Sequence, residues 1–277
     1  MVKYGIMSID FKRLPLEHCY RLARDYGFSG LEIFCTRKHV HLPSFTKEDA
    51  AYVRSLGEKY QIEVPMLTPN TLGREINICS VDARERSEGI QTYKTAVDAA
   101  EMLNVPMILL TADHPGYFVD KNAVWDHLLQ SVTEITDYAA QKGIKIVIEP
   151  LTPMESPVVT TAADCRRLID DVRSPALYAM LDIVPPVVVH ESISQYFELL
   201  EDRLAYIHIC NTDGVTDAHF RLDRGVLPIY DVLNTIKHHH YEGYITAELY
   251  SENYRDPELF LSNTARVLAE FENMRTL

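Results

Sequence analysis

Short apolar runs alternate along this chain with longer amphipathic stretches, a pattern typical of an α/β protein. Several runs are nearly continuous in apolar residues, as strands buried on both faces are. The runs predict strands at Lys3–Ser8, Gly30–Cys35, Glu63–Thr68, Met107–Ala112, Lys145–Glu149, Leu177–Asp182, Ala205–Cys210 and Tyr244–Leu249.

The stretches between these runs have the length and periodicity of surface helices. Gly27 and Gly143 follow two of them and suit the left-handed residue that ends a helix. The stretches predict helices at about Leu16–Tyr26, Lys47–Tyr60, Asp82–Leu103, Lys121–Lys142, Ala162–Asp171, Ser192–Glu201, Pro228–His240 and Pro257–Met274.

Strands that alternate with helices imply a parallel sheet with right-handed crossovers. Eight repeats in 277 residues point to a closed (β/α)₈ TIM barrel of the α/β class. An open doubly wound sheet for a nucleotide would need a Gly-rich first turn, and the chain contains no G-x-G-x-x-G. Because no Pro-rich or Gly/Ser-rich linker interrupts residues 1–277, we expect a single domain.

Charge and cysteine usage narrow the classes of function. The formal net charge is −13, and the longest basic clusters are pairs such as Lys12-Arg13, Arg37-Lys38 and Arg166-Arg167, which disfavours nucleic acid as a partner. The five cysteines show no C-x-x-C spacing, so we expect free thiols. Neither a membrane-spanning run nor a signal-peptide core is found, and we therefore predict a cytoplasmic protein.

Four residues that can bind a metal end four successive apolar runs: Glu149, Asp182, His208 and Glu248. In a barrel of parallel strands, the residues at the C-terminal strand ends converge on one mouth. Each residue alone could be a solvated strand end or a helix cap, but four in succession favour a site for one divalent cation. Oxygen-rich ligation with one imidazole suits manganese, magnesium or cobalt and tolerates zinc.

Two glutamates in such a set suggest paired acid–base chemistry. Glu149 could remove a proton from a substrate carbon while Glu248 returns one to the opposite face, or the reverse. The alternative is that both side chains only ligate the cation.

Further short segments accompany these residues. They are Arg13-Leu-Pro-Leu-Glu-His18, His114-Pro-Gly-Tyr117, Glu149-Pro-Leu-Thr-Pro153 with Glu155-Ser156, Leu181-Asp-Ile183, His208-Ile209, Asp217-Ala-His219, Tyr241-Glu-Gly-Tyr244 and Glu248-Leu249.

With these segments the chain resembles the sugar phosphate isomerase/epimerase family built on the xylose-isomerase-like barrel, and within it the ketose 3-epimerases. The resemblance implies that Glu149, Asp182, His208 and Glu248 hold one divalent ion, often manganese, and that the two glutamates exchange the proton at C3. It also implies that Glu155 binds substrate hydroxyls or steadies the catalytic glutamate.

The resemblance implies an isomerase that inverts C3 of a ketose or ketosamine through a metal-stabilised cis-enediolate, with fructoselysine to psicoselysine as the expected reaction. It also implies a homodimer or homotetramer. An aldose–ketose isomerase, an inosose-type dehydratase and a sugar sensor without turnover remain alternatives.

The chain departs from the ketose epimerases at two places. Pro185 stands where those enzymes keep a histidine, and Gly214 stands where they keep an arginine. Both positions contact the substrate in that family, so the departures disfavour a free hexulose as substrate. The fructoselysine-type members of the family resemble the chain better in these segments, but they carry a Pro-Gly-x-Gly turn where this chain has Leu222-Asp223-Arg224-Gly225. The chemistry of the far end of the substrate therefore stays open.

Three further residues are candidates for substrate contacts. His114 and His219 resemble zinc ligands of related metal-dependent endonucleases, so the rival function is a multi-zinc enzyme that cuts DNA at abasic sites. That enzyme needs more histidines than the chain offers, and we expect both residues to line the pocket and contact hydroxyls. Glu32, which we place at the end of the second strand, either contacts substrate or holds a neighbouring strand end.

Overall fold

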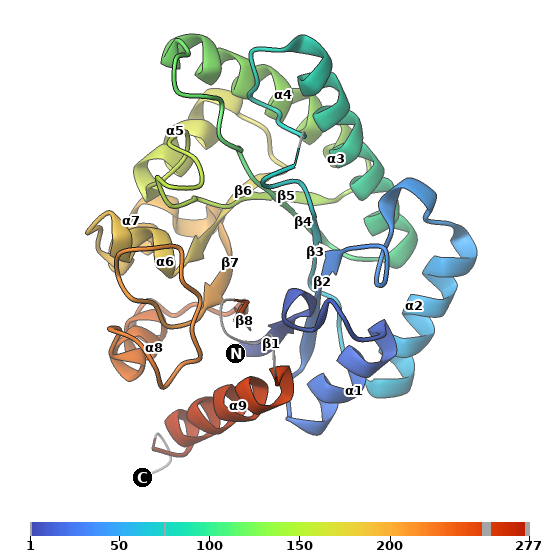
Figure 1. The fold of residues 1–277 in the computed structure, drawn as a ribbon, viewed down its shortest axis with the longest axis vertical. Helices are drawn as coiled ribbons and strands as arrows, with labels where there is room; N and C mark the ends of the chain where they lie inside the picture. The colour runs from blue at the N-terminus through green and yellow to red at the C-terminus, as the bar shows by residue number, and fades with distance from the viewer. Residues whose placement is uncertain (1, 75, 251–255, 275–277) are drawn as a thin grey trace.

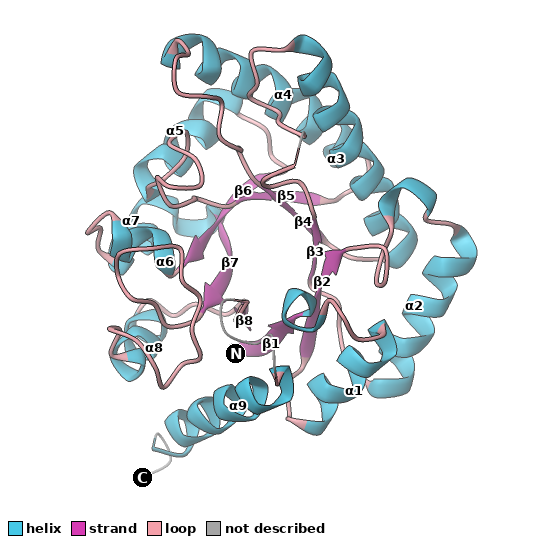
Figure 2. Ribbon diagram, in the orientation of Figure 1, coloured by secondary structure: helices cyan, strands magenta, loops and turns pink. Residues whose placement is uncertain are grey.

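The strands of this computed structural model close into a parallel barrel in the order of the sequence, with β1 (Lys3–Met7) paired to β8 (Tyr244–Ala247). The structure describes residues 2–74, 76–250 and 256–274. Figure 2 shows the ring of strands surrounded by helices, so the predicted (β/α)₈ barrel is confirmed. The other strands are β2 (Gly30–Cys35), β3 (Met66–Pro69), β4 (Met107–Leu110), β5 (Lys145–Ile148), β6 (Leu177–Asp182) and β7 (Leu204–Ile209).

The outer layer follows the predicted helices to within a few residues, as Figure 1 shows. Gly27 and Gly143 have φ of 79° and 69°, as expected for residues that end helices. The helices are α1 (Leu16–Asp25), α2 (Lys47–Tyr60), α3 (Ala83–Leu103), α4 (Lys121–Gln141), α5 (Ala162–Val172), α6 (Val184–Val188), α7 (Ile193–Leu200), α8 (Ile229–His238) and α9 (Pro257–Met274), with 3₁₀ turns η1 (Ser8–Phe11), η2 (Leu42–Ser44) and η3 (Glu201–Arg203).

Two elements differ from the sequence prediction. Strand β3 begins at Met66 rather than Glu63, because Glu63 forms only an isolated bridge to Gly30 and its carboxylate pairs with Lys3 at 2.7 Å. Helix α6 was not predicted, since it has only five residues, two of them proline. Proline in the first turn of a helix removes no hydrogen bond, so this short helix is sterically allowed.

The floor of the barrel is apolar, and the predicted ligands lie above it at the mouth. Its buried residues come from six strands: Met66, Leu109, Val147, Met180, Tyr206 and Tyr244. Because side chains in a strand alternate between two faces, residues two positions further along point into the same interior. Glu149, Asp182 and His208 stand two positions after Val147, Met180 and Tyr206, so they project into the barrel above this floor.

Burial and helix composition agree with other expectations. All five cysteines are buried and none forms a disulfide, which confirms the predicted free thiols. Within residues 2–74, 76–250 and 256–274, no helix combines the length and the apolar character that crossing a membrane requires.

Candidate metal centre and active site

The four predicted metal ligands meet at one point in the mouth of the barrel. Glu149, Asp182, His208 and Glu248 each offer a ligand atom, and these atoms lie within 4.8 Å of one another. All four residues are buried. They come from the adjacent strands β5 to β8, whose C-terminal ends share one side of the ring (Figure 1).

His208 is held between carboxylates on both edges of its ring. Its Nδ1 lies 3.2 Å from Glu149 Oε1 and 3.1 Å from Glu248 Oε2, whereas Nε2 lies 2.8 Å from Glu32 Oε2. The hydroxyl of Thr68 donates a hydrogen bond to the other oxygen of Glu32. A carboxylate on one ring nitrogen is the usual partner that fixes the tautomer of a metal-binding histidine, so Nδ1 is the nitrogen left for a cation.

The predicted position of Glu32 is therefore corrected. The residue lies inside β2, the third of six residues, rather than at the strand end. Its carboxylate is fully buried and contacts His208 across the barrel, and Glu32 is not among the residues that line the cavity at the mouth. The physical reason is the two-residue alternation of the strand, which turns Glu32 inward below the level of the ligands.

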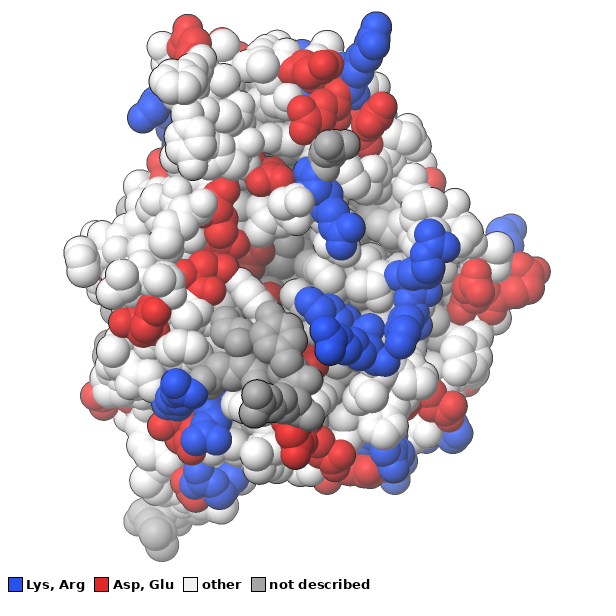
Figure 3. Space-filling view, in the orientation of Figure 1, with Lys and Arg blue, Asp and Glu red and all other residues white. Residues whose placement is uncertain are grey.

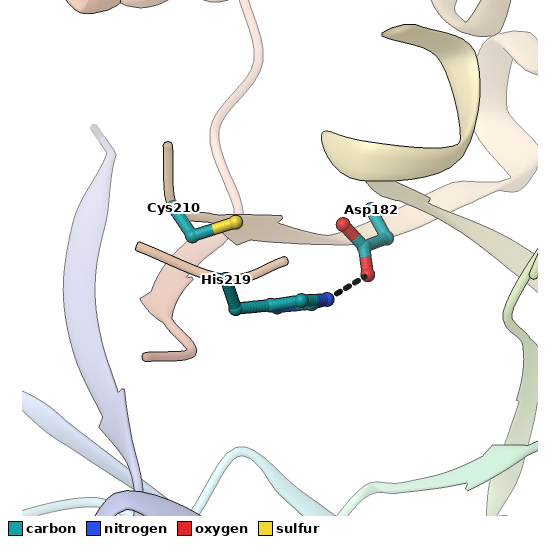
Figure 4. Close-up of side chains that lie close together, drawn as sticks. All are labelled: Asp182, Cys210 and His219. Atoms are coloured by element: carbon teal, nitrogen blue, oxygen red, sulfur yellow. Dashed lines mark ion pairs between the residues drawn. The ribbon is translucent and has the colours of Figure 1, made fainter. Parts of the chain in front are cut away.

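A second group of potential ligands shares Asp182 with the first. Figure 4 shows the imidazole of His219 pointing toward the Asp182 carboxylate, with the Cys210 thiol beside them. His219 Nε2 lies 3.9 Å from Asp182 Oδ2 and 3.3 Å from Asp217 Oδ1, and Nδ1 lies 3.4 Å from Glu248 Oε2. His219 therefore reaches the predicted site from the loop after β7.

A cavity of about 170 Å³ opens onto this cluster. Glu155 and Tyr250 line it together with His219 and three of the predicted ligands. The Glu155 carboxylate accepts hydrogen bonds from the Thr152 amide at 3.0 Å and the Thr152 hydroxyl at 2.9 Å. Glu155 therefore lines the same cavity as the predicted ligands, and its contact with substrate stays a prediction. Tyr250 was missed, although it stands two residues after Glu248.

His114 does not reach the cavity in which we expected it. It lines a separate cavity with Trp125, Tyr117 and Pro153, between the loops that precede α4 and α5. The main-chain amide of Gly116 donates to its Nδ1 at 3.0 Å, which ties the ring to its own turn. Because β4 ends at Leu110, the three residues that follow carry His114 outward to the helix layer.

The carboxylates of the cluster titrate far from their ordinary range. Burial raises the pKa of Glu149 to about 8 and that of Asp182 to about 6. Burial, together with the nearby charge of Asp217, raises the pKa of Glu155 to about 8. Burial also acts on Glu248, but the charges of His208 and His219 outweigh it and lower the pKa of that carboxyl.

The two imidazoles respond in the opposite direction. Burial alone would lower the pKa of His208, but the charges of Glu32 and Glu248 raise it well above its usual value. The pKa of His219 is likewise raised by its acidic neighbours against the effect of burial. The donor set of three carboxylates and one imidazole fits a hard divalent cation.

Comparisons with known proteins place the chain in a family. The family model described as a xylose isomerase-like TIM barrel matches residues 20–276. The chain is 34% identical over 259 residues to the fructoselysine 3-epimerase of Shigella flexneri, covering 94% of both chains.

Solved structures share the fold at lower identity. A D-psicose 3-epimerase from Clostridium cellulolyticum superposes with a TM-score of 0.82 at 18% identity, covering 98% of each chain. A 3-keto-D-glucoside 4-epimerase from Escherichia coli superposes with a TM-score of 0.82 at 17% identity, covering 99% of this chain and all of the other. The family match and the 34% identical relative both span most of the sequence, and the chain belongs to the xylose isomerase-like TIM barrel family.

Proposed function

We propose that this protein is a metal-dependent sugar epimerase that inverts C3 of a ketose or ketosamine, with fructoselysine to psicoselysine as its reaction. The observation that carries the proposal is the convergence of Glu149, Asp182, His208 and Glu248 within 4.8 Å at a cavity mouth. The 34% identity to a protein named fructoselysine 3-epimerase supports the choice of substrate. One structural relative is named as a 4-epimerase, so the fold alone does not determine which carbon of the sugar is inverted.

The four converging residues would hold one divalent cation, for which we propose manganese, although the donor set also accommodates magnesium, cobalt or zinc. When bound, a cation of this kind supplies positive charge that stabilises negative charge developing on the oxygens of the substrate. Glu32 would keep His208 in the tautomer whose Nδ1 faces the cation.

The two glutamates carry the proton at C3 in this proposal. Glu149 follows β5 and Glu248 follows β8, and each reaches Nδ1 of His208 from its own strand, at 3.2 and 3.1 Å. A sugar between them would present one face of C3 to each carboxylate. One glutamate then removes the C3 proton and the other delivers a proton to the opposite face, which inverts the configuration. A positioned acid or base contributes roughly 10²–10⁴-fold to the rate.

The remaining polar groups of the cavity would orient the sugar hydroxyls. Glu155 and Asp217 accept hydrogen bonds from hydroxyl groups, and His219 can donate one. Tyr250 donates its phenolic hydrogen bond to Asp217, which fixes that carboxylate. A small change in the position of these groups would misalign C3 with the two glutamates.

The test is exchange of the C3 hydrogen in deuterated water with manganese present. We expect loss of the C3 proton signal in the NMR spectrum of fructoselysine and the appearance of psicoselysine. An aldose or a dehydrated product would identify an isomerase or a dehydratase instead. Absence of C3 exchange with fructoselysine, psicoselysine and free ketoses would refute the proposal.

Replacing Glu32 by glutamine tests how His208 is held. We expect metal affinity to fall by roughly 10–100-fold, since loss of an outer carboxylate partner commonly has that effect. Isothermal titration with manganese measures the change. The variant Glu198→Gln, at an exposed position on α7, is the control and should bind the metal as the parent protein does. Unchanged affinity in Glu32→Gln would mean that this carboxylate does not orient the ligand.

A further inference from the structure

A larger cavity of about 820 Å³ lies next to the acidic one. The two share Ile9, Phe34 and Asn70 in their linings, so they are continuous at the mouth of the barrel. The larger cavity is formed by the loops that follow β1, β2 and β3 and by the facing side of α3. A molecule bound at the glutamates can therefore extend into it without crossing the barrel wall.

The two cavities carry opposite charge. Lys12, Arg37 and Arg74 line the larger cavity, and its lining among the described residues includes no aspartate or glutamate. The acidic cavity is lined by five carboxylates and, within the same described residues, by no lysine or arginine. Figure 3 shows basic side chains gathered on one side of the central hollow and acidic ones on the other. This separation stands out in a chain whose net charge is −13.

Within the described residues, these three cations form no ion pair with an acidic side chain. Elsewhere, basic side chains are paired on the surface, as in Lys59 with Glu17 and Lys94 with Glu134. Lys12, Arg37 and Arg74 take part in none of the ion pairs found among residues 2–74, 76–250 and 256–274. All three are exposed to solvent, so their charges are available to a ligand.

We propose that the substrate carries an anionic group at the end remote from C3, and that Lys12, Arg37 and Arg74 bind this group in the larger cavity. The inference rests on the proposed function, because it takes the sugar to lie at the glutamates. Two guanidinium groups suit a carboxylate or a phosphate, since their planar N–H groups match two oxygens at once. The apolar side chains of Ile9 and Phe34 at the junction suit a chain of methylene groups between the two ends.

This assignment separates classes of substrate. A ketosamine formed from an amino acid keeps a carboxylate far from the sugar, and a sugar phosphate carries its anion at the end of the sugar chain. A free hexulose has no group for the basic cavity. Because a polyanion would also be attracted to such a patch, a short DNA duplex belongs among the ligands to be compared.

The experiment compares matched substrates on matched variants. Fructoselysine and fructosyl-cadaverine differ by one carboxylate, and fructose 6-phosphate and fructose differ by one phosphate. We expect the Arg37→Ala/Arg74→Ala variant to lower kcat/KM at least tenfold, mainly through KM, for one substrate that carries the carboxylate or the phosphate. The partner that lacks this group should stay within twofold. A charge-assisted hydrogen bond is strong enough for this effect. Arg84→Ala, an exposed arginine outside both cavities, is the control.

The substrate pair in which kcat/KM falls only for the member with the anionic group identifies that group as a carboxylate or a phosphate. Equal losses of kcat/KM on the members with and without the carboxylate or phosphate, in both pairs, would overturn the subsite. Tighter binding of the DNA duplex than of fructoselysine and fructose 6-phosphate would do so as well. If no substrate exchanges hydrogen at C3, the proposed function fails separately. Calorimetric binding of the same four sugars to both proteins would then test the subsite alone, with the same tenfold criterion.

Discussion

Replacing Glu248 by glutamine is expected to lower the rate of C3 inversion by roughly 10²–10⁴-fold, the usual contribution of one positioned proton-transfer group. Glutamine keeps an oxygen that can ligate a cation but cannot carry the proton. In the proposed mechanism, inversion needs both carboxylates, whereas exchange with solvent needs only the one that faces the C3 hydrogen. The variant should therefore still exchange this hydrogen in one epimer and not in the other.

Glu149→Gln should show the opposite preference between the same two epimers. Deuterium incorporation at C3, started separately from fructoselysine and from psicoselysine, measures both variants. The exposed Glu198→Gln variant should behave as the parent protein. Metal content measured on each sample separates loss of the base from loss of the cation. If both variants lose exchange with the same epimer, one glutamate acts only as a ligand.

Removing the cation should lower the melting temperature as well as abolish activity. A ligand that binds only the folded state at 100 times its Kd stabilises it by about 2.7 kcal/mol. In a chain of this size that corresponds to a shift of roughly 5 °C or more. We expect chelation to produce this shift and to stop C3 exchange, and added manganese to reverse both.

The variant Asp182→Asn provides the internal comparison. It should show no manganese-dependent shift in melting temperature, because the carboxylate shared by both ligand groups is lost. Asp137→Asn, an exposed aspartate on α4, should keep the full shift. A manganese-dependent shift that persists in Asp182→Asn would place the cation elsewhere.

The barrel could be predicted because local signals and the global fold agree. Buried parallel strands appear in the sequence as apolar runs, and the helices between them end at signals such as Gly27 and Gly143. Helix α6 was not predicted, because its single turn, Val184-Pro-Pro-Val-Val, is too short to show a hydrophobic periodicity.

The ligand cluster was predictable for a topological reason. Residues at the C-terminal ends of parallel strands in a closed barrel must meet, whatever the loops do. The partner of Glu32 was not predictable in this way, because the contact with His208 crosses the barrel between β2 and β7. One signal was present: a glutamate in the middle of Gly30–Cys35, a run otherwise made of apolar residues and glycine, must face the interior or be solvated.

The pockets depended on loop shape, which sequence pattern does not determine. His114 lies four positions beyond the end of β4, whereas the four converging residues lie at the ends of their strands or follow them directly, and its loop turns it toward α4. The basic pairs Lys12-Arg13 and Arg37-Lys38 were visible but carried no sign that one member of each would join Arg74 around a common space.

The position of the four converging ligands on β5 to β8, with the basic cavity on the loops after β1 to β3, divides the molecule by task. Under the proposed function, proton transfer would belong to the second half of the chain, and selection of what is attached to the sugar would belong to the first. Loops grafted from a relative into the first half could therefore redirect the protein to another aglycone while the reacting groups stay where they are.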